Sequence, residues 1–110
     1  MTERFARIVI VGGGPAGLTA AIEARAAGAD PVVVLDANLD PGGQIWRGEA
    51  HRPPTERQST ASDVLADFGA SGAEFRGSTR VVAAPAPGEL LCEDDHGPLL
   101  MRYQALILAT

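Results

Sequence analysis

The stretch from Ile8 to Ala21, IVIVGGGPAGLTAA, limits the possible folds more than any other part of the chain. A short β-branched run is followed by three consecutive glycines, a proline, a fourth glycine and an alanine-rich segment. The β-branched run is typical of a buried strand, and Pro15 suits the first turn of a helix, where a missing N–H costs nothing. The pattern therefore predicts a strand, a tight turn almost free of side chains, and a helix.

A second strand follows at the distance that a strand–helix–strand unit requires. The segment up to Ala27 is rich in alanine, leucine and glutamate, and Gly28 is a natural helix stop. Pro31–Asp36, PVVVLD, has the composition of a buried strand with proline at its first position. Because a helix joins two strands within about thirty residues, the strands are predicted to pair in parallel.

The rest of the chain is predicted to complete an α/β, Rossmann-like fold. Residues 37–57 have the composition of a long irregular loop, and a helix with a small apolar face is predicted from Thr60, ended by Gly69 and Gly72. The turn signals PAPG and DDHGP predict a three-stranded antiparallel β-meander. The strand-like segments in this half are Glu74–Arg76, Thr79–Ala84, Leu90–Glu93, Leu99–Tyr103 and Ala105–Ala109. We expect a parallel sheet of about four strands with the meander on one face.

Gly12, Gly14 and Gly17 form a G-x-G-x-x-G motif between a predicted strand and a predicted helix. In dinucleotide-binding folds the first glycine permits a tight turn, the second lets the backbone approach a pyrophosphate, and the third lets helix and strand pack closely. The helix N-terminus adds free N–H groups and about half a positive elementary charge. Glycine-rich turns also serve packing alone, but the strand–helix–strand frame favours a bound dinucleotide.

Asp36 supports the same prediction. It ends the second strand nineteen positions after Gly17, the spacing at which an acidic residue reaches the ribose hydroxyls of adenosine. A carboxylate accepts hydrogen bonds from both hydroxyls and repels a 2′-phosphate, so FAD or NAD is favoured over NADP. The alternative is a solvated aspartate at a strand end.

The composition restricts the class of protein. The chain has 110 residues, of which 45% are hydrophobic and 21% charged, which suits one small globular domain. A net charge of −5 argues against nucleic acid or an anionic membrane as partner. The single cysteine excludes an internal disulfide, and no apolar run reaches the ~20 residues of a membrane span. We expect a cytoplasmic protein without a signal peptide.

The segments GGGPAGLTAA and VVVLDANLDPGGQIWRG resemble the N-terminus of the two-dinucleotide-binding-domain flavoproteins related to glutathione reductase. The segment PGGQIWRG is most similar to the FAD subunits of opine oxidases, hydroxyproline dehydrogenases and hydrogen cyanide synthase. The downstream DFGASGAEFRGSTRV and ALILAT are similar too, so the resemblance covers essentially the whole chain. It implies an FAD-binding domain of an oxidoreductase, in which the β-meander is the crossover before the last strand. Thioredoxin reductases share the PGGQ loop, which therefore identifies the superfamily better than the subgroup.

The resemblance also implies a set of cofactor contacts. The pyrophosphate would meet Gly12, Gly14, Pro15, Ala16 and Gly17. The ribose would meet Asp36, flanked by Ala37 and Asn38, and the adenine would receive backbone hydrogen bonds from Val81. Gly43, Gln44 and Arg47 would line the path toward the isoalloxazine, with Ala109 and Thr110 also near the cofactor. Arg47 is equally consistent with a solvated loop charge.

Other residues that often carry chemistry are assigned no such role. Cys92 lies on a predicted meander strand, where its side chain is expected to have a packing role. His51 and His96 lie in predicted loops without metal-ligand spacing. Trp46 is equally consistent with stacking near the cofactor and with covering a core edge. No catalytic residue and no metal ligand is predicted.

The resemblance further implies that residues 1–110 are the N-terminal portion of an FAD/NAD(P)-binding domain, truncated at the Ala-Thr of an Ala-Thr-Gly motif. The partners would then be FAD and the remaining flavoprotein chain or other oxidoreductase subunits. We expect Ala105–Thr110 to expose apolar surface and the isolated chain to be inactive.

Three functions stay open at this point. The first is an FAD-dependent oxidoreductase acting on the carbon–nitrogen bond of an amino acid or opine. The second is a pyridine-nucleotide-linked reductase of the thioredoxin reductase type, and the third is a non-catalytic nucleotide-binding remnant or subunit. The gene sequence beyond codon 110 would separate them. A second G-x-G-x-x-G with CxxC favours the reductase, a cysteine-rich iron–sulfur segment favours amine oxidation, and a stop codon favours the remnant.

Overall fold

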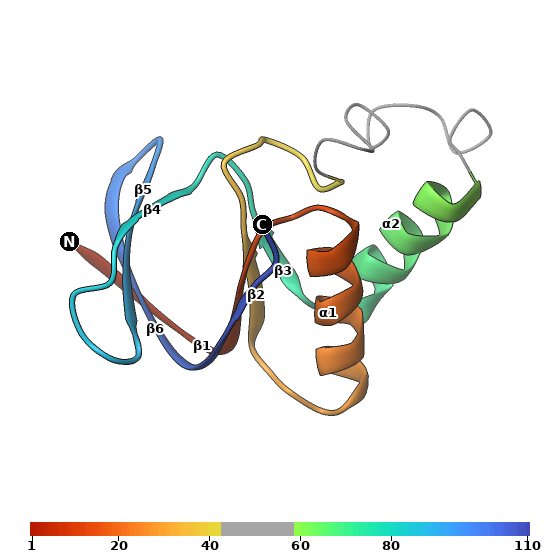
Figure 1. Cartoon of the computed structure of the whole chain (residues 1–110), viewed down its shortest axis with the longest axis horizontal. Helices are drawn as coiled ribbons and strands as arrows, with labels where there is room; N and C mark the ends of the chain where they lie inside the picture. The colour runs from red at the N-terminus through yellow and green to blue at the C-terminus, as the bar shows by residue number, and fades with distance from the viewer. Residues whose placement is uncertain (43–58) are drawn as a thin grey trace.

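The computed structural model describes residues 1–42 and 59–110, and its strands form one sheet with two helices (Figure 1). The elements in chain order are β1 (Thr2–Val11), α1 (Pro15–Ala26), β2 (Val32–Leu35), α2 (Ser59–Ser71), β3 (Glu74–Arg76), β4 (Arg80–Ala83), β5 (Glu89–Asp94) and β6 (Gly97–Leu108). The strands lie in the order β3-β2-β1-β6-β5-β4. The predicted α/β fold class is confirmed.

The elements β1, α1 and β2 form the predicted strand–helix–strand unit. β1 and β2 pair in parallel, from Ile8 opposite Val32 to Val11 opposite Leu35. α1 begins at Pro15, as predicted, and the chain turns after it at Gly28, whose φ of +95° favours glycine. β3 pairs in parallel with β2, and β6 pairs in parallel with β1, which gives the expected four parallel strands.

One prediction about the strands is wrong. Leu99–Tyr103 and Ala105–Ala109 are predicted as separate strands, but residues 99–108 belong to the single strand β6, which ends one residue before Ala109. Its first part pairs antiparallel with β5, while β1 pairs with it from Leu99 to Leu108. No glycine or proline interrupts residues 99–108, so the strand bends instead of ending. β1 is longer than predicted because its first residues, Thr2–Ala6, pair with this part of β6.

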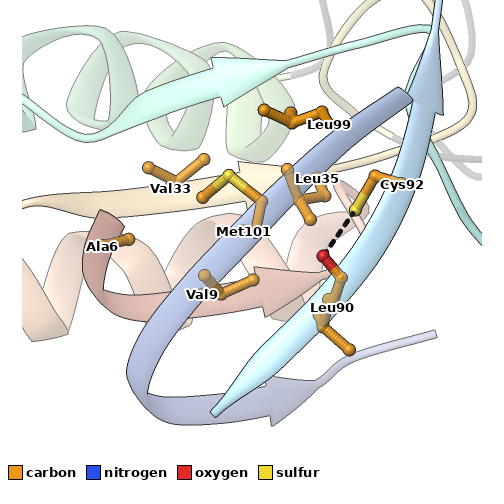
Figure 2. Close-up of a cluster of buried hydrophobic side chains, with 8 residues drawn as sticks. All are labelled: Ala6, Val9, Val33, Leu35, Leu90, Cys92, Leu99 and Met101. Atoms are coloured by element: carbon orange, nitrogen blue, oxygen red, sulfur yellow. Dashed lines mark hydrogen bonds between the residues drawn. The ribbon is translucent and has the colours of Figure 1, made fainter. Parts of the chain in front are cut away.

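The bend in β6 folds the meander over one face of the parallel strands. The meander consists of β4, β5 and the first part of β6, which pair antiparallel as predicted. Figure 2 shows the core between the two, formed by Ala6, Val9, Val33, Leu35, Leu90, Cys92, Leu99 and Met101. Cys92 is fully buried there, as expected, and burial raises the pKa of its thiol.

The helices cover the opposite face of the parallel strands. Side chains of β1 alternate between the two faces, so Val9 contacts the meander core and Ile10 the helix core. Phe68 of α2 meets Phe75 of β3 edge-to-face, with ring centroids 6.4 Å apart. β2 is buried along its whole length, which explains its unbroken apolar sequence. Neither helix in the described part of the chain is long and apolar enough to cross a membrane.

The C-terminal part of β6 exposes apolar side chains. Leu108 is 71% exposed and Ile107 36% exposed. β5 pairs with β6 only as far as Arg102, so among the described strands one edge of β6 beyond that residue has no partner. The apolar exposure expected at Ala105–Thr110 is confirmed.

Helix α1 packs closely against the glycine loop and β1 at Gly17, which is buried. A Cβ atom there would overlap the carbonyl oxygen of Gly12 and would lie 3.5 Å from the side chain of Ile10. The helix can therefore rest on the loop and the strand at this distance only because Gly17 has no side chain.

Gly17→Ala should lower the free energy of unfolding by about 2–3 kcal/mol, because backbone rather than a flexible side chain must move. Gly69→Ala is the matched control. Gly69 is exposed in α2, and an added Cβ would meet nothing within 4 Å, so alanine should stabilise the helix by about 0.5–1 kcal/mol. Urea denaturation of both variants measures the difference. Equal stabilities would contradict the close packing at Gly17.

Charged side chains bridge β3 and the meander. Arg76 of β3 donates to Glu74 Oε2 at 3.0 Å and to Asp94 Oδ2 of β5 at 3.4 Å, and Arg4 of β1 donates to Glu74 Oε1 at 2.9 Å. The other oxygen of Asp94 accepts the backbone N–H of His96 at 2.7 Å. The His96 N–H and, more weakly, the Arg76 guanidinium lower the pKa of the Asp94 carboxyl.

Asp94→Asn should therefore destabilise the fold most at neutral pH. A lowered folded-state pKa means that the stabilisation is present above the unfolded pKa and is lost as pH falls through the folded pKa. In urea denaturation, the deficit of the variant relative to the wild type should stay constant from about pH 7 to about pH 4 and shrink as the pH falls further. Asp95→Asn, at the exposed neighbouring position, should show no such pH-dependent deficit. The same pH profile for both variants would rule out this role of Asp94.

Candidate cofactor site

The candidate site lies where the carboxyl ends of three parallel strands meet. β1 leads into the glycine loop at Gly12, β2 leads into Asp36, and β6 leads into Ala109 and Thr110. Figure 1 shows the C-terminus beside the loop from β1 to α1. The crevice at the carboxyl ends of parallel strands is the usual ligand site of open α/β sheets.

The glycine loop is shaped by close backbone contacts. Gly12 has a φ of +117°, and a Cβ atom on it would lie 2.6 Å from the carbonyl oxygen of Ala109. Its own N–H donates to Leu35 O at 2.9 Å, and the Ala109 N–H donates to Val11 O at 2.8 Å. The loop is thus held between β2 and the end of β6, and the tight turn predicted at Gly12 is present.

The N-terminus of α1 opens toward this loop without a side-chain cap. Gly14 is the N-cap residue, in an extended conformation, and among the described residues it makes no side-chain cap hydrogen bond. The first turn also carries no acidic residue, and Pro15 occupies its start. The remaining N–H groups of the first turn and the helix dipole therefore stay available for an anion. This arrangement fits a pyrophosphate.

Asp36 lies against the glycine loop. A Cβ atom on Gly13 would lie 3.2 Å from Asp36 Oδ2, so backbone and carboxylate are nearly in contact. The Asp36 carboxylate accepts a hydrogen bond from Asn38 Nδ2 at 3.2 Å. The structure thus brings together the two parts of the predicted site, the glycine loop and the strand-end carboxylate.

The predicted adenosine contacts come from the turn after β2 and from β4. Ala37 and Asn38 are exposed, and Val81 is on β4, an outer strand of the sheet, with its side chain against the meander core. An open groove of about 360 Å³ lies between Ala37 and the meander, and its lining residues are Ala37, Ser78, Arg80, Glu93, Asp94 and Asp95. The groove provides room for a flat ring beside Ala37.

Some predicted residues lie outside the described part of the chain, namely Gly43, Gln44 and Arg47, together with Trp46 and His51. The described chain before them runs back to the site, since the Gly42 N–H donates to Gly13 O at 2.7 Å. Among the described residues, no group of histidine, cysteine, aspartate and glutamate side chains could hold a metal ion.

Four residues without a predicted role also shape the site. Gly13 packs beside Asp36, and Gly77, Ser78 and Thr79 follow β3. Gly13 is an unspecified position of the glycine motif, so the motif does not single it out. The glycine in RGST was the available signal for the second group, but it resembles any turn glycine.

Comparisons with known proteins agree with this geometry. Residues 6–110 match the family model described as pyridine nucleotide-disulphide oxidoreductase. An opine oxidase subunit of Rhizobium meliloti (strain 1021) is 34% identical over 108 residues, covering 93% of this chain and 23% of that protein. The chain therefore spans about a quarter of the length of this relative.

Solved structures share the fold at low sequence identity. The L-proline dehydrogenase of P. horikoshii superposes with a TM-score of 0.76 at 17% identity, covering 99% of this chain and 23% of that one. The myxobacterial halogenase CndH, described as a variant of FAD-dependent halogenases, has a TM-score of 0.68 at 14% identity, covering 97% of this chain and 37% of that one. The family match over residues 6–110 shows that this chain belongs to the pyridine nucleotide-disulphide oxidoreductase family, and it confirms FAD as the cofactor.

Proposed function

We propose that this chain holds the ADP half of FAD in an oxidoreductase that oxidises a carbon–nitrogen bond of an amino acid or opine. The observation that carries the cofactor assignment is the uncapped N-terminus of α1 beside the Asp36 carboxylate. The similarity to the opine oxidase of Rhizobium meliloti supports the substrate class. When bound, FAD supplies the redox chemistry by accepting electrons from the substrate.

In this proposal the residues of the chain bind and orient the cofactor. The residues around the pyrophosphate are Gly12, Gly14, Pro15, Ala16 and Gly17, whose backbone N–H groups and helix dipole stabilise its negative charge. Asp36 accepts hydrogen bonds from the ribose hydroxyls, with Ala37 and Asn38 beside it. Val81 offers backbone groups to adenine, which the groove next to Ala37 would accommodate. The remaining assigned positions are Ala109 and Thr110 near the cofactor and Gly43, Gln44 and Arg47 toward the flavin.

The separation of charge at this edge would orient the nucleotide. The positive end of α1 favours the phosphates, whereas the Asp36 carboxylate favours a hydrogen-bond donor such as a hydroxyl and repels further negative charge. The diphosphate and the sugar therefore have different preferred places a few residues apart. FAD, with free ribose hydroxyls, fits both, while a 2′-phosphorylated nucleotide would place negative charge against Asp36.

The rest of the enzyme belongs to the proposal as well. Residues 1–110 would be the N-terminal part of an FAD/NAD(P)-binding domain in a longer protein, and the remaining chain or a further oxidoreductase subunit would supply the substrate site. The longer protein is proposed because this chain covers only 23% of the opine oxidase subunit and 23% of the L-proline dehydrogenase chain. We propose a cytoplasmic location from the composition and the single cysteine.

A disulfide reductase is the second candidate, because the matching family is described by that activity. The single cysteine of the chain is buried, and its thiol pKa is raised, so this chain supplies no exchanging thiol pair. Disulfide chemistry would need cysteines elsewhere in a longer protein.

The full-length protein should lose its flavin absorbance when mixed anaerobically with an opine or a secondary amino acid. Reduced pyridine nucleotide with a disulfide substrate is the parallel assay for the second candidate. Bleaching by the opine or amino acid supports the proposed substrate class. Bleaching by the pyridine nucleotide alone, followed by disulfide turnover, would overturn it.

Asp36→Ala should weaken FAD binding by about 1–3 kcal/mol, the range for hydrogen bonds to a charged group. Fluorescence quenching of FAD by the full-length apoprotein measures the affinity. Asp67→Ala, at an exposed position of α2, is the matched control and should leave the affinity unchanged. If Asp36→Ala also leaves it unchanged, the aspartate is a solvated strand end and not a ribose ligand.

A further inference from the structure

We propose that Asn38 is a positioning residue, whose side-chain amide fixes the Asp36 carboxylate for the ribose, and that the Gly77–Thr79 turn holds Asn38 in place. The inference rests on the proposed contact between Asp36 and ribose. It assigns the selectivity for ribose hydroxyls to a segment that lies about forty residues beyond Asp36 in the sequence.

The first observation concerns the two oxygens of the Asp36 carboxylate. Oδ2 accepts the hydrogen bond from Asn38 Nδ2 at 3.2 Å and lies beside the backbone of Gly13. Within the described residues, no donor is bonded to Oδ1. One oxygen is thus held by the protein, which fixes the carboxylate plane, while the other remains available to a hydroxyl of the ligand.

The second observation concerns the backbone of the Asp36–Asn38 turn. The Asp36 N–H donates to Arg76 O at 3.1 Å, and the Thr79 N–H donates to Asp36 O at 2.9 Å. The Ser78 N–H donates to Asn38 O at 2.9 Å. These three hydrogen bonds join the turn after β2 to the turn after β3, so the position of Asn38 depends on the shape of residues 77–79.

The third observation is that the Gly77–Thr79 turn has a tightly constrained conformation. A Cβ atom on Gly77 would collide with the carbonyl oxygen of Leu39 and would lie 2.8 Å from that of Asn38. Ser78 has a φ of +48°, in the left-handed region that few non-glycine residues adopt. Thr79 is only 3% exposed, and its Oγ1 donates to Gly77 O at 2.9 Å.

A carboxylate held in one orientation before binding loses little conformational freedom when the ribose arrives. A freely rotating aspartate would attract any nearby donor and would discriminate less between a ribose and a deoxyribose. The Asn38 amide therefore strengthens the binding of the ribose hydroxyl and not of the nucleotide as a whole. A positioning role thus predicts a change in the preference for ribose over deoxyribose, which a merely structural role would not produce.

Asn38→Ala in the full-length apoprotein tests the inference, because the side chain is exposed and its removal leaves the backbone hydrogen bond from Ser78 in place. Calorimetric titration with ADP and with 2′-deoxy-ADP gives the preference for the 2′-hydroxyl. The variant should bind ADP ~3–10-fold more weakly, while its affinity for 2′-deoxy-ADP changes much less, so the preference shrinks. Equal losses for both nucleotides, or no loss, would overturn the inference.

Gly77→Ala tests the turn itself with the same two nucleotides. It should reduce the preference for ADP as Asn38→Ala does, whereas Gly69→Ala, where the added Cβ meets nothing within 4 Å, should leave it unchanged. An unchanged preference in Gly77→Ala would contradict the role of the turn. Asp36→Ala distinguishes a failure of the proposed ribose contact from a failure of the positioning role of Asn38. If it leaves the preference unchanged, the proposed ribose contact fails, and if only the Asn38 and Gly77 variants leave it unchanged, the positioning inference alone fails.

Discussion

β1 is the strand on which the rest of the structure depends, because it pairs in parallel along both of its edges. β2 occupies one edge and β6 the other, while the helices cover one face and the meander the other. Parallel strands point the same way, so the carboxyl ends of all three reach one edge of the sheet. The glycine loop, Asp36 and Ala109 meet there although they lie far apart in the sequence.

Close contacts between backbone segments recur at this edge. Gly12 faces the carbonyl of Ala109, Gly17 faces the carbonyl of Gly12, and Gly77 faces the carbonyl of Leu39. In each case a side chain would push two elements apart. The first two contacts set the distance between the loop, helix α1 and β6, and the third sets the distance between the turns after β2 and β3. These glycines therefore determine the spacing between elements, and of the three only Gly12 also has a positive φ.

The candidate site favours a negatively charged group although the chain as a whole is negatively charged. The net charge is −5, yet the family cofactor carries a diphosphate. The start of α1 offers a local site for negative charge, because its first turn has no acidic residue and its N-cap, Gly14, makes no side-chain cap hydrogen bond to the described residues. The carboxylate of Asp36 stands one loop away, where a sugar rather than a phosphate would lie in the proposed arrangement. Meanwhile the paired charges of Arg76 and Asp94 lie between β3 and the meander.

The sequence by itself determined the β1–α1–β2 unit, the parallel pairing within it and the family. The signals for these are local: a β-branched run, a glycine motif, a proline at a helix start and an acidic residue at a fixed spacing. The same locality made Gly12, Gly14, Gly17 and Asp36 identifiable as candidates. Only the tertiary structure decided that residues 99–108 form one bent strand, because β1 pairs along both parts of it. Only the tertiary structure placed the Gly77–Thr79 turn against Asp36 and Asn38, since contacts between segments about forty residues apart leave no periodic pattern in the sequence.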